Sequence, residues 1–268
     1  MPFAELSDAR IHYRSYGNGP PVVGIMGFGL DQRFWAAQVP AVAERNRFIT
    51  FDNRGTGRTE GPIPSSIDEM AADVIRLLDH LEIPKAAVFG VSMGGAIAQR
   101  VVVDHPDRVE ALILGITFAR PIEYMRRRQA LAEELMRTVS SERFMEAAML
   151  WMFTPHFFEI GQDNLDRMLA SFMGPGAPEP AAPETLLAQS EAIHKHDVLE
   201  HLPKISCPTL VFGGKQDIMV PYFASQEIAT AIPQAEFRSF ETGHGCMIEE
   251  MGEVNEMIRD FLDRCGGA

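Results

Sequence analysis

The chain has 268 residues, 46% of them hydrophobic, which suits one large α/β domain with a packed core and excludes disordered and fibrous classes. Its formal net charge of -13 argues against nucleic acid or an acidic membrane surface as a partner, since either would require a basic face. There is no long apolar stretch and no basic, signal-like start, so we expect a cytoplasmic protein without a membrane partner. Three cysteines without metal-ligand spacing predict reduced thiols and no metal site.

Predicted strands and helices alternate along most of the chain. Residues 1–17 alternate polar and apolar positions and predict an opening antiparallel pair of strands. Buried strands are predicted by apolar runs at 21–26, 47–51, 88–91, 109–116 and 208–212, and a further strand is predicted at 236–240. Helical patterns occupy 32–44, 67–81, 222–232 and 248–265, and Ser66 with Glu69 has the order of a capping box. This alternation predicts a parallel sheet wrapped by helices.

The strand pattern stops after Thr117 and returns near residue 208. Helical patterns in between are rich in methionine and aromatic residues, and a Gly- and Pro-rich stretch at 174–178 is a predicted hinge. Such side chains can fill a small core of the insertion or form an adaptable apolar roof over a pocket. Trp151 and Met152 share one helix face, and we take them as candidate substrate-binding residues. An apolar pocket would favour medium-chain apolar ligands over charged ones.

Ser92 stands in the most informative motif of the chain, with Gly90 and Gly94 two residues to either side. The spacing G-x-S-x-G is that of a nucleophile elbow, in which a sharp turn joins a strand to a helix. A serine at such an apex adopts a sparsely populated backbone conformation, and side chains at the flanking positions would clash. The pattern predicts a serine nucleophile above the amino end of a helix.

A serine nucleophile needs a base, and the base needs a carboxylate that orients it. Reactive groups of doubly wound sheets lie just after strands. His244 is the histidine of the eight that follows a late strand within a small-residue loop. Asp217 follows the strand that ends near Phe212. The residues therefore predict a catalytic set of Ser92, His244 and Asp217.

Acyl transfer also requires amide donors for the oxyanion. The backbone N–H groups of Met93 and Phe28 are the candidates, because Met93 follows the nucleophile and Phe28 follows the strand that ends at Met26. Asp52 and Arg54 lie after another strand, and we interpret them as shaping a turn.

These motifs together resemble the α/β-hydrolase fold family over nearly the whole chain, with Ser92, Asp217 and His244 in the order typical of that family. The pattern is similar to small bacterial carboxylesterases, 3-oxoadipate enol-lactonases and aminoacrylate hydrolases. The resemblance implies an eight-stranded, mostly parallel sheet, a helical cap after strand six, and no metal or organic cofactor. It divides the chain into a core of 1–117 and 204–268 and a cap of 118–203. Met26 departs from the histidine that many members carry there.

The expected function is hydrolysis of a small-molecule carboxylic ester or lactone through an acyl-enzyme. Cleavage of a C–C, amide or carbamate bond, or perhydrolysis, could use the same residues. A receptor that keeps the shape without turnover is the alternative from another class. The sequence predicts no particular oligomeric state.

Overall fold

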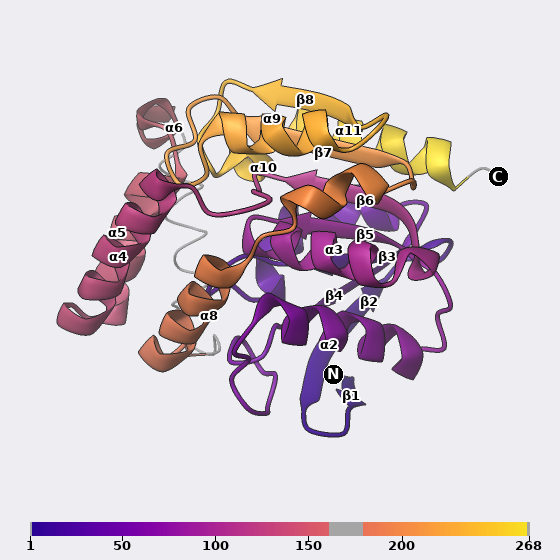
Figure 1. The fold of residues 1–268 in the computed structure, drawn as a ribbon, viewed down its shortest axis with the longest axis horizontal. Helices are drawn as coiled ribbons and strands as arrows, with labels where there is room; N and C mark the ends of the chain where they lie inside the picture. The colour runs from indigo at the N-terminus through magenta and orange to yellow at the C-terminus, as the bar shows by residue number, and fades with distance from the viewer. Residues whose placement is uncertain (1, 161–178, 267–268) are drawn as a thin grey trace.

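The computed structural model describes residues 2–160 and 179–266, and its strands form a single eight-stranded sheet in the order β1-β2-β4-β3-β5-β6-β7-β8 (Figure 1). β2 is antiparallel to β1 and β4, and the remaining neighbours are parallel. The predicted mostly parallel eight-stranded sheet is thus confirmed. The strands are β1 Phe3–Glu5, β2 Arg10–Tyr16, β3 Pro21–Ile25, β4 Arg47–Phe51, β5 Ala86–Val91, β6 Val109–Gly115, β7 Thr209–Gly214 and β8 Glu236–Phe240.

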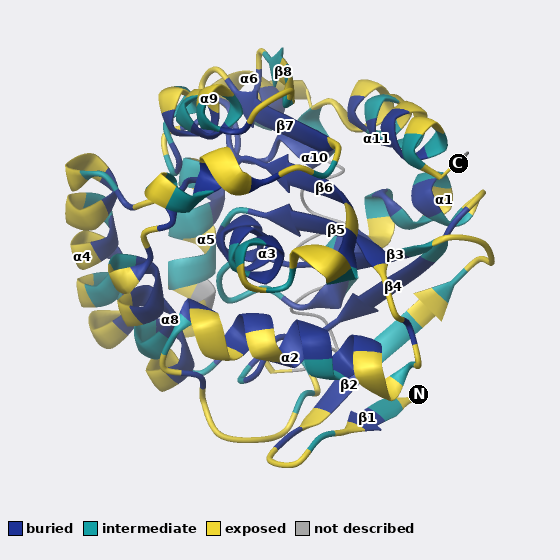
Figure 2. Ribbon diagram, turned by 45° about the vertical axis from the view of Figure 1, so that its right-hand side comes forward, coloured by how far each residue is buried: buried dark blue, intermediate teal, exposed yellow. Residues whose placement is uncertain are grey.

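Helices cover both faces of this sheet, and their outer sides are exposed while the central strands are buried (Figure 2). Alternate residues of β5 point to opposite faces, so Val88 enters one apolar cluster and Phe89 enters the other. The helices of the first cluster are α2 Ile67–His80, α3 Met93–Asp104 and α9 Tyr222–Ala231. Those of the second are the 3-10 helix η1 Gln32–Ala37, α1 Val39–Ala43, α10 Cys246–Glu249 and α11 Met251–Cys265.

Two predicted helices are divided in the structure. The pattern at 32–44 becomes η1 and α1, because Pro40 has no N–H to continue an α-helix across the junction. The pattern at 248–265 becomes α10 and α11. The Gln38 side-chain amide donates to the Met247 carbonyl at 2.9 Å, and a continuous helix would use that carbonyl internally.

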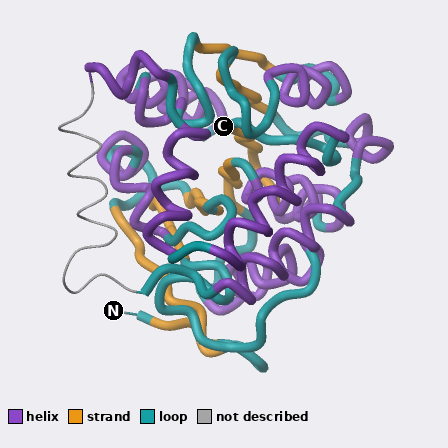
Figure 3. The backbone as a smooth tube through the Cα atoms, turned by 90° about the vertical axis from the view of Figure 1, so that its left-hand side faces the viewer, coloured by secondary structure: helices purple, strands orange, loops and turns teal. Residues whose placement is uncertain are grey.

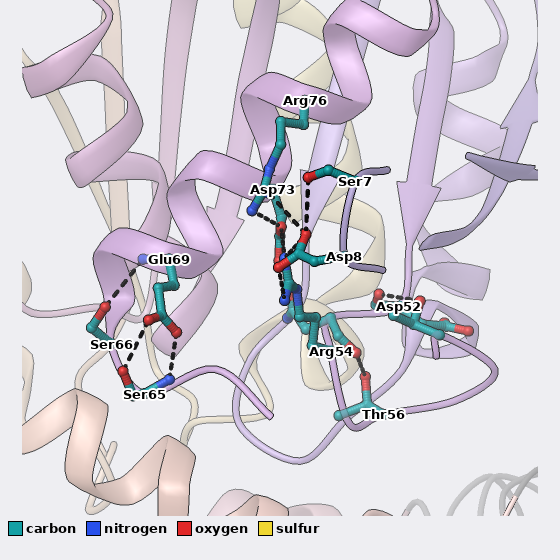
Figure 4. A network of polar contacts seen from close by, with 12 residues as sticks. Ser7, Asp8, Asp52, Arg54, Thr56, Ser65, Ser66, Glu69, Asp73 and Arg76 are labelled. Atoms are coloured by element: carbon teal, nitrogen blue, oxygen red, sulfur yellow. Dashed lines mark hydrogen bonds and ion pairs between the residues drawn. The ribbon is translucent and has the colours of Figure 1, made fainter. Parts of the chain in front are cut away.

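The start of α2 has a modified capping box (Figure 4). The Ser66 hydroxyl accepts from the Glu69 backbone N–H at 3.1 Å, as predicted. The Glu69 carboxylate instead accepts from the backbone N–H of Ser65, at 2.7 Å, and from its hydroxyl. Ser66 is therefore the N-cap that the motif predicts, while the return bond of Glu69 reaches Ser65, one residue further back.

The chain segment that connects β6 to β7 is helical, and α4, α5, α6 and α8 of this segment lie to the left of the sheet in Figure 1 and toward the viewer in Figure 3. The helices of the segment are α4 Glu123–Thr138, α5 Ser141–Met152, α6 Pro155–Ile160, α8 Pro183–Lys195 and the 3-10 helix η3 Leu199–Lys204. The two ends of this segment meet where the Val198 N–H donates to the Ala119 carbonyl at 3.1 Å. The 118–203 cap boundary stays a prediction, and the 174–178 hinge lies outside the described residues. None of the described helices has the length and apolarity needed to cross a membrane.

The methionine and aromatic residues of this segment fill small cores of their own and also face a cavity. Met149, Phe153 and Phe157 form one such core, with the rings of Phe153 and Phe157 stacked at 4.8 Å. Met125 and Trp151 line the cavity. Both interpretations of the pattern therefore apply, to different residues.

Candidate active site

Ser92 occupies the turn between β5 and α3 with φ 54° and ψ -122°, a conformation that costs about 1–3 kcal/mol in a non-glycine residue. The neighbouring glycines make that turn possible. A Cβ at Gly90 would collide with the Gly94 carbonyl oxygen, and a Cβ at Gly94 would collide with the Ile25 carbonyl oxygen. The Thr117 hydroxyl donates to the Ser92 carbonyl at 2.6 Å and fixes the turn from β6.

The loops after β7 and β8 bring Asp217 and His244 to this serine. His244 Nε2 lies 3.0 Å from Ser92 Oγ, and His244 Nδ1 lies 2.7 Å from Asp217 Oδ2. The other Asp217 oxygen accepts from the N–H groups of Met219 and Val220, at 2.7 and 2.8 Å. An ionised carboxylate accepts all three bonds, which assigns the His244 proton to Nδ1 and leaves Nε2 to accept the serine proton.

The loop that carries His244 is held by two contacts that the sequence did not reveal. Glu249 accepts from the Gly243 N–H at 2.9 Å and also from the Thr154 hydroxyl at the start of α6. The Gly245 N–H donates to the Met152 carbonyl at 2.7 Å. The helical segment after β6 therefore fixes the position of the imidazole.

A second loop, residues 27–29, packs directly on the serine. A Cβ at Gly27 would lie 3.2 Å from the Ser92 Cβ, so the chain can approach the nucleophile this closely only with glycine or a small shift. The Asn53 amide donates to the Met26 carbonyl at 3.0 Å, and the Gly29 N–H donates to Gln189 Oε1 at 2.8 Å. Asn53 and Gln189 thus hold the loop from either end.

The candidate oxyanion donors flank the nucleophile in this arrangement. Phe28 lies between the two glycines, and Met93 opens α3, so its N–H has no partner inside the helix. The side chain of Met26 is 2% exposed and packs among the apolar residues of the second cluster. Because Asn53 binds the Met26 carbonyl, the loop is ordered through the backbone rather than through a histidine at position 26.

Ser92 and His244 open into a cavity of about 150 Å³ between the sheet and the helices after β6. Its wall is mostly apolar, and the predicted residues Trp151 and Met152 are part of it, as is Phe28. Apolar contributions also come from Met125, Ala132, Met136, Phe144, Met145, Leu186, Val220 and Ile248. The lining is not purely apolar, because Arg128 of α4 belongs to it. Most of the lining agrees with the predicted apolar pocket, and Arg128 adds a cation to it.

The remaining motif residues lie away from the cavity. Asp52 accepts from the N–H groups of Gln32 and Arg58, at 3.0 and 2.9 Å. Arg54 is 5% exposed and forms paired hydrogen bonds with Asp73 and Asp8 (Figure 4). The Asp73 carboxylate raises the Arg54 pKa above its ordinary range. These contacts support the interpretation that Asp52 and Arg54 shape a turn.

Cys246 lies close to the site but is a poor competitor for the nucleophile role. It is completely buried, and burial raises the pKa of its thiol to about 12. A thiol needs its ionised form to attack, so this cysteine stays unreactive near neutral pH.

Comparison with known proteins agrees with the nucleophile elbow, the neighbouring imidazole and the parallel sheet. The sequence matches the alpha/beta hydrolase fold family over residues 20–250. The chain belongs to this family, as the motifs indicated, and is a hydrolase of that fold.

Individual relatives cover nearly the whole chain. A protein of Azorhizobium caulinodans named "Putative carbamate hydrolase RutD" is 30% identical, and the match covers 99% of this chain and 98% of the relative. The crystal structure of an enol-lactonase from Burkholderia xenovorans LB400 superposes with a TM-score of 0.88 at 28% identity, covering 97% of this chain and 99% of that one. The structure of a thermophilic esterase from Thermogutta terrifontis superposes with a TM-score of 0.83 at 28% identity, covering 96% of this chain and 94% of that one.

Proposed function

We propose that this hydrolase cleaves a carboxylic ester or lactone of a small molecule through an acyl-enzyme on Ser92. The observation that carries the proposal is the continuous chain of contacts from Ser92 Oγ through His244 to Asp217, at 3.0 and 2.7 Å. Both distances are within the range for proton transfer and for orientation of the base.

In the first half of the reaction, Ser92 Oγ attacks the carbonyl carbon while His244 Nε2 takes the hydroxyl proton. Asp217 keeps its own charge and stabilises the imidazolium that forms. The imidazolium then gives its proton to the departing alkoxide, and the acyl group remains on the serine. Water deprotonated by His244 releases the acid in the second half.

The negative charge of the tetrahedral intermediate is expected to face the N–H groups of Phe28 and Met93. Each such donor contributes on the order of 3 kcal/mol to the transition state. The amino end of α3, where Met93 lies, adds a favourable dipole. Trp151 and Met152 would contact the bound substrate from the wall of the cavity.

The proposal is tested with a panel of p-nitrophenyl esters and small lactones, using the wild type and Ser92→Ala. We expect ester or lactone turnover that falls by about 10⁴-fold or more in the variant. Unchanged turnover in Ser92→Ala would remove the mechanism. Adding amides, β-diketones and peroxide to the panel tests the other reactions available to the same site.

Carbamate hydrolysis is a second candidate, favoured by the name of the relative that is 30% identical over nearly the whole chain. The attack on the carbonyl would be the same. A carbamate carbonyl is less electrophilic than that of an ester, so the rates must be compared for matched leaving groups. A kcat/KM for a p-nitrophenyl carbamate above that of the corresponding ester would reverse the order of the two candidates.

A further inference from the structure

Arg128 is a cation in the wall of a mostly apolar cavity, whose polar lining also includes Gln129, Ser141 and His194. It lies on α4 between Met125 and Ala132, which face the same cavity. Its side chain is half-buried, and its Nε atom is inaccessible and has no hydrogen-bond partner among the described residues. Arg128 thus lines the same cavity as Ser92.

The charge of Arg128 is poorly compensated within residues 2–160 and 179–266. No carboxylate of these residues forms an ion pair with it. Its polar contact is Nη2 to the neutral Gln129 Oε1 at 3.3 Å, and its Cζ lies 5.9 Å from the centre of the Trp151 ring. Burial lowers the Arg128 pKa, and electrostatic interactions with Tyr124 and Asp217 oppose this shift. The guanidinium remains protonated near neutral pH.

Two other arginines of this molecule, one buried and one exposed, each have a carboxylate partner. Arg54 is buried, and two carboxylates satisfy its nitrogens at 2.7 to 3.1 Å. Arg127 is exposed and pairs with Glu123 at 2.8 Å. Arg128 is partly buried, and among residues 2–160 and 179–266 it has no carboxylate partner. Burying a charge without one is unfavourable, so such a group is suited to a negatively charged ligand.

We propose that Arg128 binds a carboxylate of the substrate, at a position remote from the carbonyl that Ser92 attacks. This inference rests on the proposed function and narrows its substrate class to small esters, lactones or carbamates that carry a second, free carboxylate. A guanidinium matches a carboxylate through two parallel N–H···O bonds, which fixes orientation as well as charge. The net charge of -13 gives no long-range attraction for such a substrate, so recognition depends on this local cation.

The first test compares the mono-p-nitrophenyl ester of glutaric acid with p-nitrophenyl pentanoate, which lacks the carboxylate. The kcat/KM for the glutarate ester is divided by that for the pentanoate ester. This ratio is measured for wild type, Arg128→Met, Arg128→Lys and the exposed control Arg127→Met. We expect the ratio to fall about 10- to 100-fold in Arg128→Met, since charge-assisted bonds of this type are lost. Arg128→Lys should recover part of it, and Arg127→Met should match the wild type. An unchanged ratio in Arg128→Met, or an equal loss for both esters, would overturn the inference.

A binding measurement separates this inference from the proposed reaction. Calorimetry of Ser92→Ala with monomethyl glutarate and with dimethyl glutarate requires no turnover. We expect the monoester to bind at least tenfold more tightly, and the preference to disappear in Ser92→Ala/Arg128→Met. Equal binding of the two esters would refute the role of Arg128 even if ester turnover is fast. A preference that depends on Arg128 supports it even if no ester is hydrolysed, in which case the proposed reaction alone fails.

Discussion

Within the described residues, two buried histidines are each paired with an aspartate, and a serine accompanies one of these pairs. His244 Nδ1 and Asp217 Oδ2 are 2.7 Å apart, and so are His12 Nδ1 and Asp52 Oδ2. His244 presents Nε2 to Ser92 and to the cavity. His12 Nε2 is buried without a hydrogen-bond partner in the described part of the chain. The hydrogen bond between histidine and aspartate therefore does not define a catalytic site by itself.

The two pairs differ in what surrounds them. Both aspartates follow strands, but His244 lies in a loop after β8, whereas His12 lies inside β2, the neighbour of β4. The His12 N–H donates to the Thr59 hydroxyl at 2.9 Å, and that hydroxyl donates to the Asp52 carbonyl. The turn held in this way carries Asn53, which binds the loop beside Ser92. One pair would act on substrate, and the other holds the scaffold.

The largest expected contrast is between the two histidines. His244→Gln should lower kcat for an ester by about 10⁴-fold or more because the base is lost, with a small change in the free energy of unfolding. His12→Gln should do the reverse, lowering the free energy of unfolding by about 2–4 kcal/mol through loss of a buried bond to Asp52. Urea unfolding and ester kinetics on both variants measure this. Strong loss of kcat in a folded His12→Gln would break the distinction.

The two aspartates should give the same contrast with a somewhat smaller effect on rate. Asp217→Asn would favour the wrong imidazole tautomer and is expected to lower kcat by about 10³- to 10⁴-fold. Asp52→Asn should mainly lower the urea midpoint, since its carboxylate accepts from His12 and two backbone N–H groups. Steady-state kinetics beside unfolding curves separate the two. If both variants lost activity in proportion to stability, the pairs would be equivalent.

A third buried histidine, His196, has no carboxylate bonded to its ring in the described part of the chain, and it tests the effect of burial without such a bond. Burial lowers its pKa from 6.5 to about 4, with Arg100 adding to the effect and Asp197 opposing it. Between these values the unfolded chain binds more protons, so stability must fall as pH decreases from 6.5 toward 4, by at most about 3 kcal/mol. Urea unfolding of wild type and His196→Leu at several pH values measures this slope. The exposed control His156→Leu should keep it, and an unchanged slope in His196→Leu would contradict the account.

The smallest expected effect concerns the loop beside the serine. Gln189→Ala removes the acceptor for the Gly29 N–H and should lower kcat about fivefold with little change in KM, through loss of about 1 kcal/mol of positioning. Ser190→Ala is the matched control on α8, since Ser190 instead bonds Glu133 of α4. Steady-state kinetics on the same ester decide this. Equal effects of the two truncations would mean that Gln189 acts only through the stability of α8.

The sequence predicts the fold and the three central side chains for one physical reason. Ser92 directly follows β5, Asp217 and His244 lie in the loops after β7 and β8, and the carboxyl ends of parallel strands meet at one edge. His12 falls within the predicted opening strands instead of after a late strand, and the structure places it inside β2. Local pattern and order along the chain suffice for these residues.

Contacts between distant segments could not be predicted in this way. Gln189 meets Gly29 across 160 positions, and Glu249 reaches Thr154 across 95, so both depend on how the helices after β6 pack. Arg128 belongs to a run of three arginines, and the sequence does not tell which of them faces the cavity. The contact of Asn53 could have been predicted in part, because Asn53 lies just after β4, which pairs with β3. The same residues are also typical of a simple turn.

The most direct test of the central claim is mass spectrometry of the protein after exposure to a fluorophosphonate. We expect one covalent adduct on the peptide that contains Ser92, formed at least about 10³-fold more slowly in His244→Gln and at a near wild-type rate in His12→Gln. Ester turnover by a wild type that carries no adduct on Ser92, or equal labelling rates in the two histidine variants, would contradict the account.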